Sequence, residues 1–226
     1  MNKTYLAALS LYLFSGVASA NWSATVTGVS DYLFNGVSQT DEGPAIQGSI
    51  DWAGDNGFYA GTWASNVDFG DDTNLEWDVY AGYYTSFDNG VNLDVGIAQY
   101  TYHGAGYSSD GNYPEAYMKW NYGGTDINFW YSWDYFGTGV GHVIAMANHT
   151  FNLPHEIDLL VGIDQSQSLD GDKWEWEPGD KNYIHWQVTG MYSYQGFDFS
   201  LGVQGTDLET YGDTKVLFTI ARTFSF

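Results

Sequence analysis

Hydrophobic and polar side chains alternate along most of this chain, in segments of about ten residues. Every second position from Ile127 to Tyr135 is apolar or aromatic, and the same holds from Val216 to Phe226 apart from Arg222. A period of two places these side chains on one face of a β-strand. Twelve segments follow the pattern: 22–34, 44–53, 58–69, 75–87, 91–102, 113–122, 126–136, 142–151, 156–165, 183–194, 197–206 and 214–226. The sequence therefore predicts an all-β fold of about twelve strands.

The links between these segments alternate between two kinds. The short links contain Gly or polar turn formers, which suits tight hairpins; they are 54–57, 88–90, 123–124, 152–155 and 195–196. The others, such as 103–112 and 166–182, are longer and more acidic. Short turns at one end and long loops at the other are typical of a transmembrane antiparallel up-and-down β-barrel.

Alternation alone would also fit a β-sandwich. The barrel is favoured because Tyr131, Trp133 and Tyr135 gather at one end of an apolar face, as in an interfacial girdle. An open sheet edge in hydrocarbon would leave backbone groups unpaired. We therefore expect the segment 213–226 to pair with the segment 22–34. The strand registers are least determined in 58–69 and 142–151.

The first twenty residues have the pattern of a cleaved signal peptide. Lys3 is their only charge, residues 5–14 are mostly apolar, and Ala18 and Ala20 are spaced for cleavage. We expect residues 1–20 to be removed and residues 21–226 to form one barrel domain. The aromatic Phe226 resembles the terminal signal that the barrel-insertion machinery recognises. We therefore expect export through the periplasm to the bacterial outer membrane, with lipid and lipopolysaccharide as partners.

The composition narrows the function. Asp and Glu number 28 and Lys and Arg only 6, for a net charge of −22, which argues against nucleic-acid binding. The 10 Trp, 19 Tyr and 13 Phe argue against disorder, although the charge alone would suggest it. Because Cys is absent, thiolate metal sites, thiol nucleophiles and disulfides are excluded.

The polar face of the predicted barrel is mainly acidic. If the strands alternate in direction, its carboxylates form two groups, one near each mouth of the lumen, with few cations between them. The predicted lining residues are Asp51, Asp94, Asp126, Asp158 and Asp198 near the short turns, Asp31, Glu76, Asp78, Glu115, Asp134 and Asp164 near the long loops, and Lys119 and Lys215. Rings of carboxylates are one basis of cation preference in a pore. The alternative is that these acids are only solvated rim residues.

Three stretches resemble the TorF family, a proteobacterial family of proposed porins. They are residues 30–39 (SDYLFNGVSQ), 44–48 (PAIQG) and 57–67 (GFYAGTWASNV), which lie in the first third of the predicted mature chain. The resemblance implies an outer-membrane barrel and a channel, without a known substrate. In that family an Arg is common at the position of Asn35. Its absence here implies a more acidic lumen and argues against a shared anion-binding role.

No catalytic constellation is apparent. The five His residues are scattered and no Gly-x-Ser-x-Gly motif is present, so an outer-membrane enzyme is not predicted. The acidic loop 170–180 has oxygen ligands for calcium but lacks the EF-hand spacing, which favours a solvated loop. Divalent-ion bridging to lipopolysaccharide phosphates is the alternative there. No cofactor is predicted.

We therefore predict a narrow passive channel for cations or small neutral solutes. The alternative is a plugged barrel with a structural or surface-interaction role, because inward Tyr80, Tyr84, Tyr100, Tyr117 and Trp130 would narrow or block the lumen. Twelve strands lie between the filled interior of about eight strands and the open channel of about sixteen. The solute, the gating and the oligomeric state are not determined by the sequence.

Overall fold

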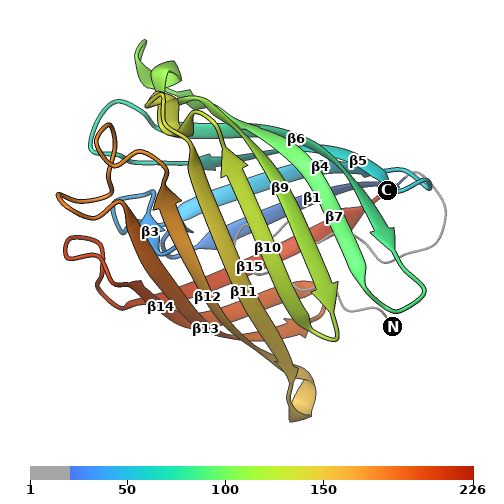
Figure 1. Ribbon diagram of the computed structural model, residues 1–226. Helices are drawn as coiled ribbons and strands as arrows, with labels where there is room; N and C mark the ends of the chain where they lie inside the picture. Colours follow the sequence, from blue (N-terminus) through green and yellow to red (C-terminus); the bar gives the residue numbers. More distant parts are fainter. Residues whose placement is uncertain (1–20) are drawn as a thin grey trace.

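A computed structural model describes residues 21–226 as a β-barrel (Figure 1). The predicted signal peptide, residues 1–20, lies outside the described residues. The long strands are β1 (Asn21–Val29), β4 (Ala45–Ala53), β5 (Phe58–Asn66), β6 (Leu75–Ser86), β7 (Asn92–Tyr100), β9 (Tyr113–Tyr122), β10 (Thr125–Ser132), β11 (His142–Asn152), β12 (Ile157–Ser168), β13 (Asn182–Tyr194), β14 (Phe197–Thr206) and β15 (Lys215–Ser225). Shorter elements are β2 (Leu33–Phe34), β3 (Val37–Ser38), β8 (Tyr102–His103) and the 3-10 turns η1 (Ser108–Gly111), η2 (Tyr135–Gly137) and η3 (Pro154–Glu156).

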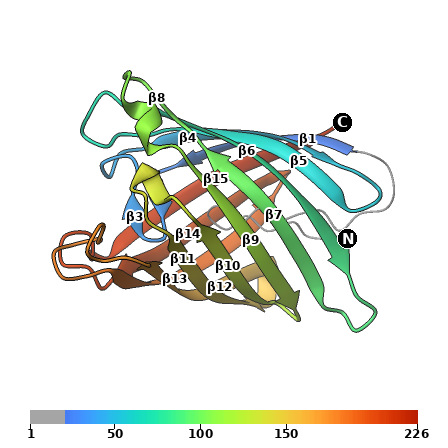
Figure 2. The same ribbon diagram turned by 45° about the horizontal axis from the view of Figure 1, so that its top comes forward.

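The sheet closes on itself. Each long strand pairs with its neighbours along the chain, and β15 pairs antiparallel with β1, so that Val29 lies opposite Thr219 on one side and Ala45 on the other. The expected pairing of the last strand with the first is confirmed. Figures 1 and 2 show the strands tilted around a common axis.

The two ends of the barrel differ as predicted. At one end, here called the turn end, the links are short; between β13 and β14 only Gln195 and Gly196 intervene, both with positive φ (51° and 80°). That pair of angles gives the tight turn whose twist matches a hairpin. At the other end, here called the loop end, six longer links connect the strands: 30–44, 67–74, 101–112, 133–141, 169–181 and 207–214.

Burial follows the pattern of a membrane barrel. Along β6, Trp77 and Val79 are 51% and 49% exposed, whereas Glu76 and Asp78, which alternate with them, are 2% and 4% exposed. Apolar side chains thus cover the outside and polar ones face the lumen, which is the alternation expected of strands between lipid and a polar interior. None of the helices among residues 21–226 has the length and apolar character of a membrane span.

Several strand ends differ from the prediction. The segment 22–34 ends as a strand at Val29, the segment 58–69 at Asn66 and the segment 126–136 at Ser132. The predicted outward position of Tyr135 is wrong, because η2 turns its ring over the barrel end and leaves it 1% exposed. Alternation continued past these ends in the sequence, but turns that begin there reverse the chain.

Candidate functional site: the lumen and its inward hairpin

A two-strand hairpin of the first long loop enters the lumen. β2 and β3 are joined by Asn35 and Gly36, whose φ values of 46° and 84° match a two-residue hairpin turn. Leu33 is buried, and Phe34 packs against the tyrosine cluster of the lumen. The hairpin therefore occupies part of the barrel's cross-section near the loop end.

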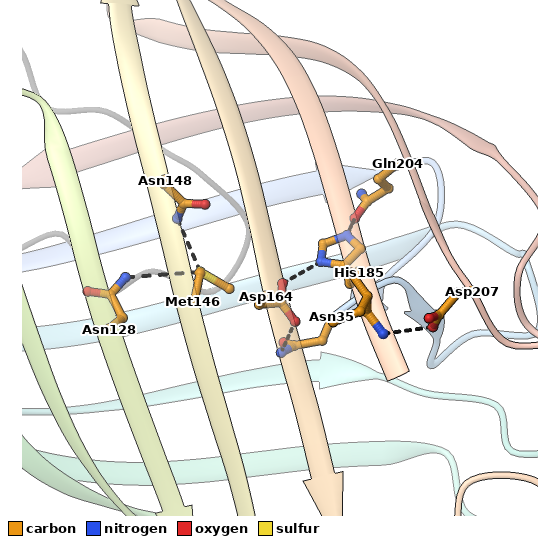
Figure 3. A network of polar contacts seen from close by, with 9 residues as sticks. Asn35, Asn128, Met146, Asn148, Asp164, His185, Gln204 and Asp207 are labelled. Atoms are coloured by element: carbon orange, nitrogen blue, oxygen red, sulfur yellow. Dashed lines mark hydrogen bonds and ion pairs between the residues drawn. The ribbon is translucent and has the colours of Figure 1, made fainter. Parts of the chain in front are cut away.

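The hairpin tip is fastened to the barrel wall formed by β12, β13 and β14 (Figure 3). Asn35 Nδ2 donates to Asp164 Oδ1 at 3.1 Å, and the other oxygen of Asp164 contacts His185 Nδ1 at 2.6 Å. His185 Nε2 contacts Gln204 Oε1 at 2.7 Å. These wall residues lie on β12, β13 and β14 and are all buried. A polar row across three strands thus ends on the hairpin.

The base of the hairpin is ordered by Asp31. Its Oδ1 accepts hydrogen bonds from the hydroxyls of Ser38 at 2.6 Å and Thr40 at 3.1 Å. Burial raises the pKa of Asp31, although these two hydroxyls and Lys215 favour the charged form. Asp31 therefore shapes the first loop as well as adding a carboxylate to it.

A second wall combines tyrosines with carboxylates. Tyr100 donates to Glu115 at 2.9 Å, and Tyr102 donates to Glu76 Oε1 at 3.3 Å. The Oε2 atoms of Glu76 and Glu115 are buried without a hydrogen-bond partner among the described residues. Unsatisfied buried polar atoms of this kind are uncommon in native proteins.

Nearer the turn end, the same wall carries a cation. Tyr59 donates to Asp94 at 2.5 Å and lies 2.5 Å from the hydroxyl of Tyr117. The ammonium of Lys119 lies over the Tyr117 ring, 4.5 Å from its centroid, and 5.7 Å from that of Trp130. An inward cation is thus held by ring faces beside a carboxylate.

The other predicted lining residues have local partners. Asp51 accepts from Ser49 at 2.7 Å and from Tyr80. In the turn-end half, Asp126 accepts from Asn121 at 2.9 Å, Asp158 from Asn152 at 2.6 Å and Asp198 from Ser193 at 2.5 Å. At the loop end, Asp78 accepts from the Thr101 amide at 3.4 Å, Asp134 accepts from the Gly139 amide at 2.7 Å, and Lys215 pairs with Glu42.

The loop 169–181 covers part of the loop end. Trp174 and Trp176 contact the ring of Tyr135 at centroid distances of 5.2 and 5.9 Å, and Tyr135 stacks on His142 at 4.0 Å. Among residues 21–226, no group of three or more His, Asp and Glu side chains is placed to hold a metal. Sequence reasoning missed this aromatic cover, although two Trp residues in an otherwise hydrophilic loop were a signal for it.

A carboxylate fastens this loop to its neighbour. Glu177 accepts hydrogen bonds from the Thr210 amide at 2.6 Å and the Glu209 amide at 2.8 Å. Burial acts to raise the pKa of Glu177, but the backbone donors outweigh it and hold the pKa below its usual range. The ionised side chain therefore holds 169–181 against the loop 207–214.

Comparison with known proteins agrees with this architecture. The model of the family Gcw_chp, described as bacterial protein of unknown function, matches residues 15–224. The chain belongs to this family. No curated protein sequence matches it.

Several solved porin structures have the same fold as this chain. The KdgM porin in complex with disordered oligogalacturonate is 12% identical, with a TM-score of 0.53 over 91% of this chain and 99% of that one. The KdgM porin alone is 14% identical, with a TM-score of 0.55 over 90% and 99%. The NanC porin is 11% identical, with a TM-score of 0.54 over 91% and 99%. At these identities the likeness establishes the fold, a closed antiparallel barrel of twelve long strands.

Proposed function

We propose that this protein is an outer-membrane porin-like channel that passes cations or small neutral solutes through a narrow acidic lumen. The observation that carries the proposal is the row of buried inward carboxylates in a closed barrel with an apolar exterior, exemplified by Glu76, Asp78 and Glu115. Inward carboxylates favour cations electrostatically. The fold shared with the KdgM and NanC porins supports a channel. The resemblance to the TorF family, which remains a prediction, also implies a channel.

The charge of the lumen argues for a solute different from the one found with a structural neighbour. The KdgM porin was solved with oligogalacturonate, a polyanion. In this chain, we propose that Asp164, Asp94 and Glu115 line the path of the solute, where Asn35 supplies no charge at the hairpin tip. Repulsion between like charges therefore argues for cations or neutral solutes.

The exterior supports an outer-membrane location with lipid as partner. Large aromatic side chains are exposed around the turn end, as in an interfacial girdle; they include Trp22, Phe58, Phe87, Tyr122, Phe151, Tyr194 and Phe226. The exposed Arg222 lies over the rings of Phe197 and Phe224 at 4.8 and 5.1 Å, which suits the headgroup boundary. We further propose that the acidic loop end faces lipopolysaccharide and that Phe226 contacts the insertion machinery.

The buried tyrosines favour a second candidate, a plugged barrel with a structural or surface role. Tyr59, Tyr80 and Tyr117 are all buried in the lumen, and Trp174 and Trp176 cover its loop end. A barrel filled in this way would carry no solute. The two candidates differ in one observable, the ionic current through the inserted protein.

Planar-bilayer recording of the refolded chain tests the channel. We expect discrete current steps above leak and a preference for cations. Asp94→Asn together with Asp158→Asn removes two inward carboxylates and should lower the cation preference. The exposed turn-end pair Asp55→Asn and Asp88→Asn is the matched control and should change it less. Absence of steps would favour the plugged barrel, and unchanged selectivity in the first pair would place the filter elsewhere.

A further inference from the structure

A cavity of about 720 Å³ lies at the loop end, above the lumen. Its wall comes from the first, second, third, fourth and sixth long loops, so residues far apart in the sequence meet there. The first loop contributes Asp41 and Glu42, and the second contributes Asp68 and Asp71. We call this cavity the vestibule. Its position at the loop end places it on the side from which a solute would reach the lumen.

The vestibule carries mainly negative charge. The four carboxylates face one ammonium, Lys215, which is paired with Glu42. Asp68 and Asp71 each use one oxygen to accept a backbone amide, from Gly70 at 2.9 Å and Thr73 at 2.7 Å. The second oxygen of each is left for a ligand or solvent.

Behind Tyr102, a residue of the vestibule wall, lies a further carboxylate. Tyr102 lines the cavity, and its hydroxyl donates to Glu76 Oε1. Glu76 is buried, and its Oε2 has no hydrogen-bond partner among residues 21–226. A buried carboxylate with one oxygen left without a donor is only partly compensated for its desolvation, and a nearby cation would offset the remainder. The acidic series therefore continues below the vestibule.

Aromatic rings supply the other half of the wall. Phe69 contacts Tyr102 edge-on at 5.6 Å between ring centroids, and Phe136 stacks on Tyr102 at 5.2 Å. Tyr107, which also lines the cavity, is exposed. Ring faces attract cations and bury methylene groups. A contact between a cation and a ring face already occurs inside the barrel, where the ammonium of Lys119 lies over the Tyr117 ring.

We propose that the vestibule binds linear organic diamines and polyamines. Their ammonium groups pair with carboxylates of the two loops, and their methylene stems lie on the exposed Phe69 and Tyr107 rings. Two separated charges on an apolar stem match separated carboxylates between aromatic faces better than a compact metal ion does. The inference rests on the proposed channel, for which it names a class of solute, but the binding step itself requires no current.

Calorimetric titration of the full refolded chain in detergent micelles tests the inference with three probes. Cadaverine carries two ammonium groups on an apolar stem. Magnesium carries the same charge without the stem, and the diol of the same length carries the stem without the charge. We expect saturable binding of cadaverine and weaker binding of both other probes. Equal binding of magnesium would overturn the proposal in favour of a generic acidic surface, and so would absence of cadaverine binding.

Variants locate the site. Asp68→Asn with Asp71→Asn keeps a side-chain oxygen for each turn and removes two charges, and should weaken cadaverine binding roughly fivefold. Phe69→Leu removes a ring face and should weaken it roughly threefold. Asp55→Asn with Asp88→Asn, the same charge change at the turn end, should leave affinity unchanged. Equal losses in both double variants would overturn the assignment to the vestibule.

Recording in bilayers on the same preparations separates this inference from the channel. Cadaverine binding without current would retain the vestibule site and overturn the channel. Current without cadaverine binding would retain the channel and overturn the vestibule site.

Discussion

Gly36 stands at the closest approach between the hairpin tip and the barrel wall. A Cβ atom at this position would lie 2.5 Å from Thr206 Cγ2 and 2.7 Å from His185 Cδ2, both well inside van der Waals contact. Its φ of 84° also disfavours any other residue. The hairpin reaches Asp164 because this position has no side chain.

Gly36→Val should displace the hairpin from the wall and increase single-channel conductance. Gly90→Val is the matched control, because Gly90 also has a φ of 84° but its Cβ would meet nothing closer than 3.6 Å. Both variants carry the same backbone penalty, about 1–2 kcal/mol. Bilayer recording of the pair isolates the effect of the hairpin. Equal conductance in the two variants would show that the hairpin does not restrict current.

We expect the contact that Glu177 makes between the loops 169–181 and 207–214 to be sensitive to pH. Backbone hydrogen bonds hold its folded-state pKa below the unfolded value, although burial opposes them. The stabilisation is therefore fully present above the unfolded pKa and is lost as the pH falls through the folded pKa. We expect hydrogen-exchange protection of the Glu209 and Thr210 amides, corrected for intrinsic rates, to fall on acidification.

Glu177→Gln should remove this pH dependence, since Gln has no charge to lose. The exposed neighbour Glu175→Gln provides the control and should keep the wild-type profile. A flat profile in the wild type would show that Glu177 does not hold the two loops together.

At the scale of the strand, depth in the membrane decides the cost of a charge. On β12, Val161 faces outward near the strand centre, and Gln165 faces outward near the loop end. Val161→Lys should destabilise the folded barrel by about 2–4 kcal/mol, and Gln165→Lys by about 0–1 kcal/mol. Urea unfolding in lipid vesicles measures the difference. Equal costs would contradict the assignment of this face to hydrocarbon.

The strands themselves could be predicted because lipid on one side and a polar lumen on the other enforce strict alternation. β6, with exposed Trp77 and buried Glu76, shows the pattern that the sequence contained. The ends could not be placed as well, since alternation persists into the loops. The missed signal was the Asn35-Gly36 pair, a strong hairpin marker that shortened the first strand and created β2 and β3.

The candidate site was predictable only in part, because contacts across a barrel depend on how loops fold. The periodicity gave the inward position of Asp164, but not its hydrogen bond to Asn35, 129 residues away in sequence. Tyr135 could not be placed either, because η2 reverses its direction after β10 ends. Inward-facing positions follow from local alternation, whereas loop contacts follow from tertiary packing.

Over the whole molecule, charge and apolar surface are segregated. Carboxylates face the lumen and lie at both ends of the barrel, whereas apolar and aromatic groups face outward. A net charge of −22 with so few cations would repel anions from both mouths. Selectivity is therefore expected to depend on ionic strength and to weaken as salt screens the rim carboxylates, while those buried in the lumen are screened less.

We propose above all that this barrel is a channel whose acidic lumen prefers cations. The reversal potential of the wild-type protein across a potassium chloride gradient tests it most directly. We expect a current that reverses toward the potassium equilibrium potential. A reversal toward the chloride equilibrium potential, or no current at all from inserted protein, would contradict it.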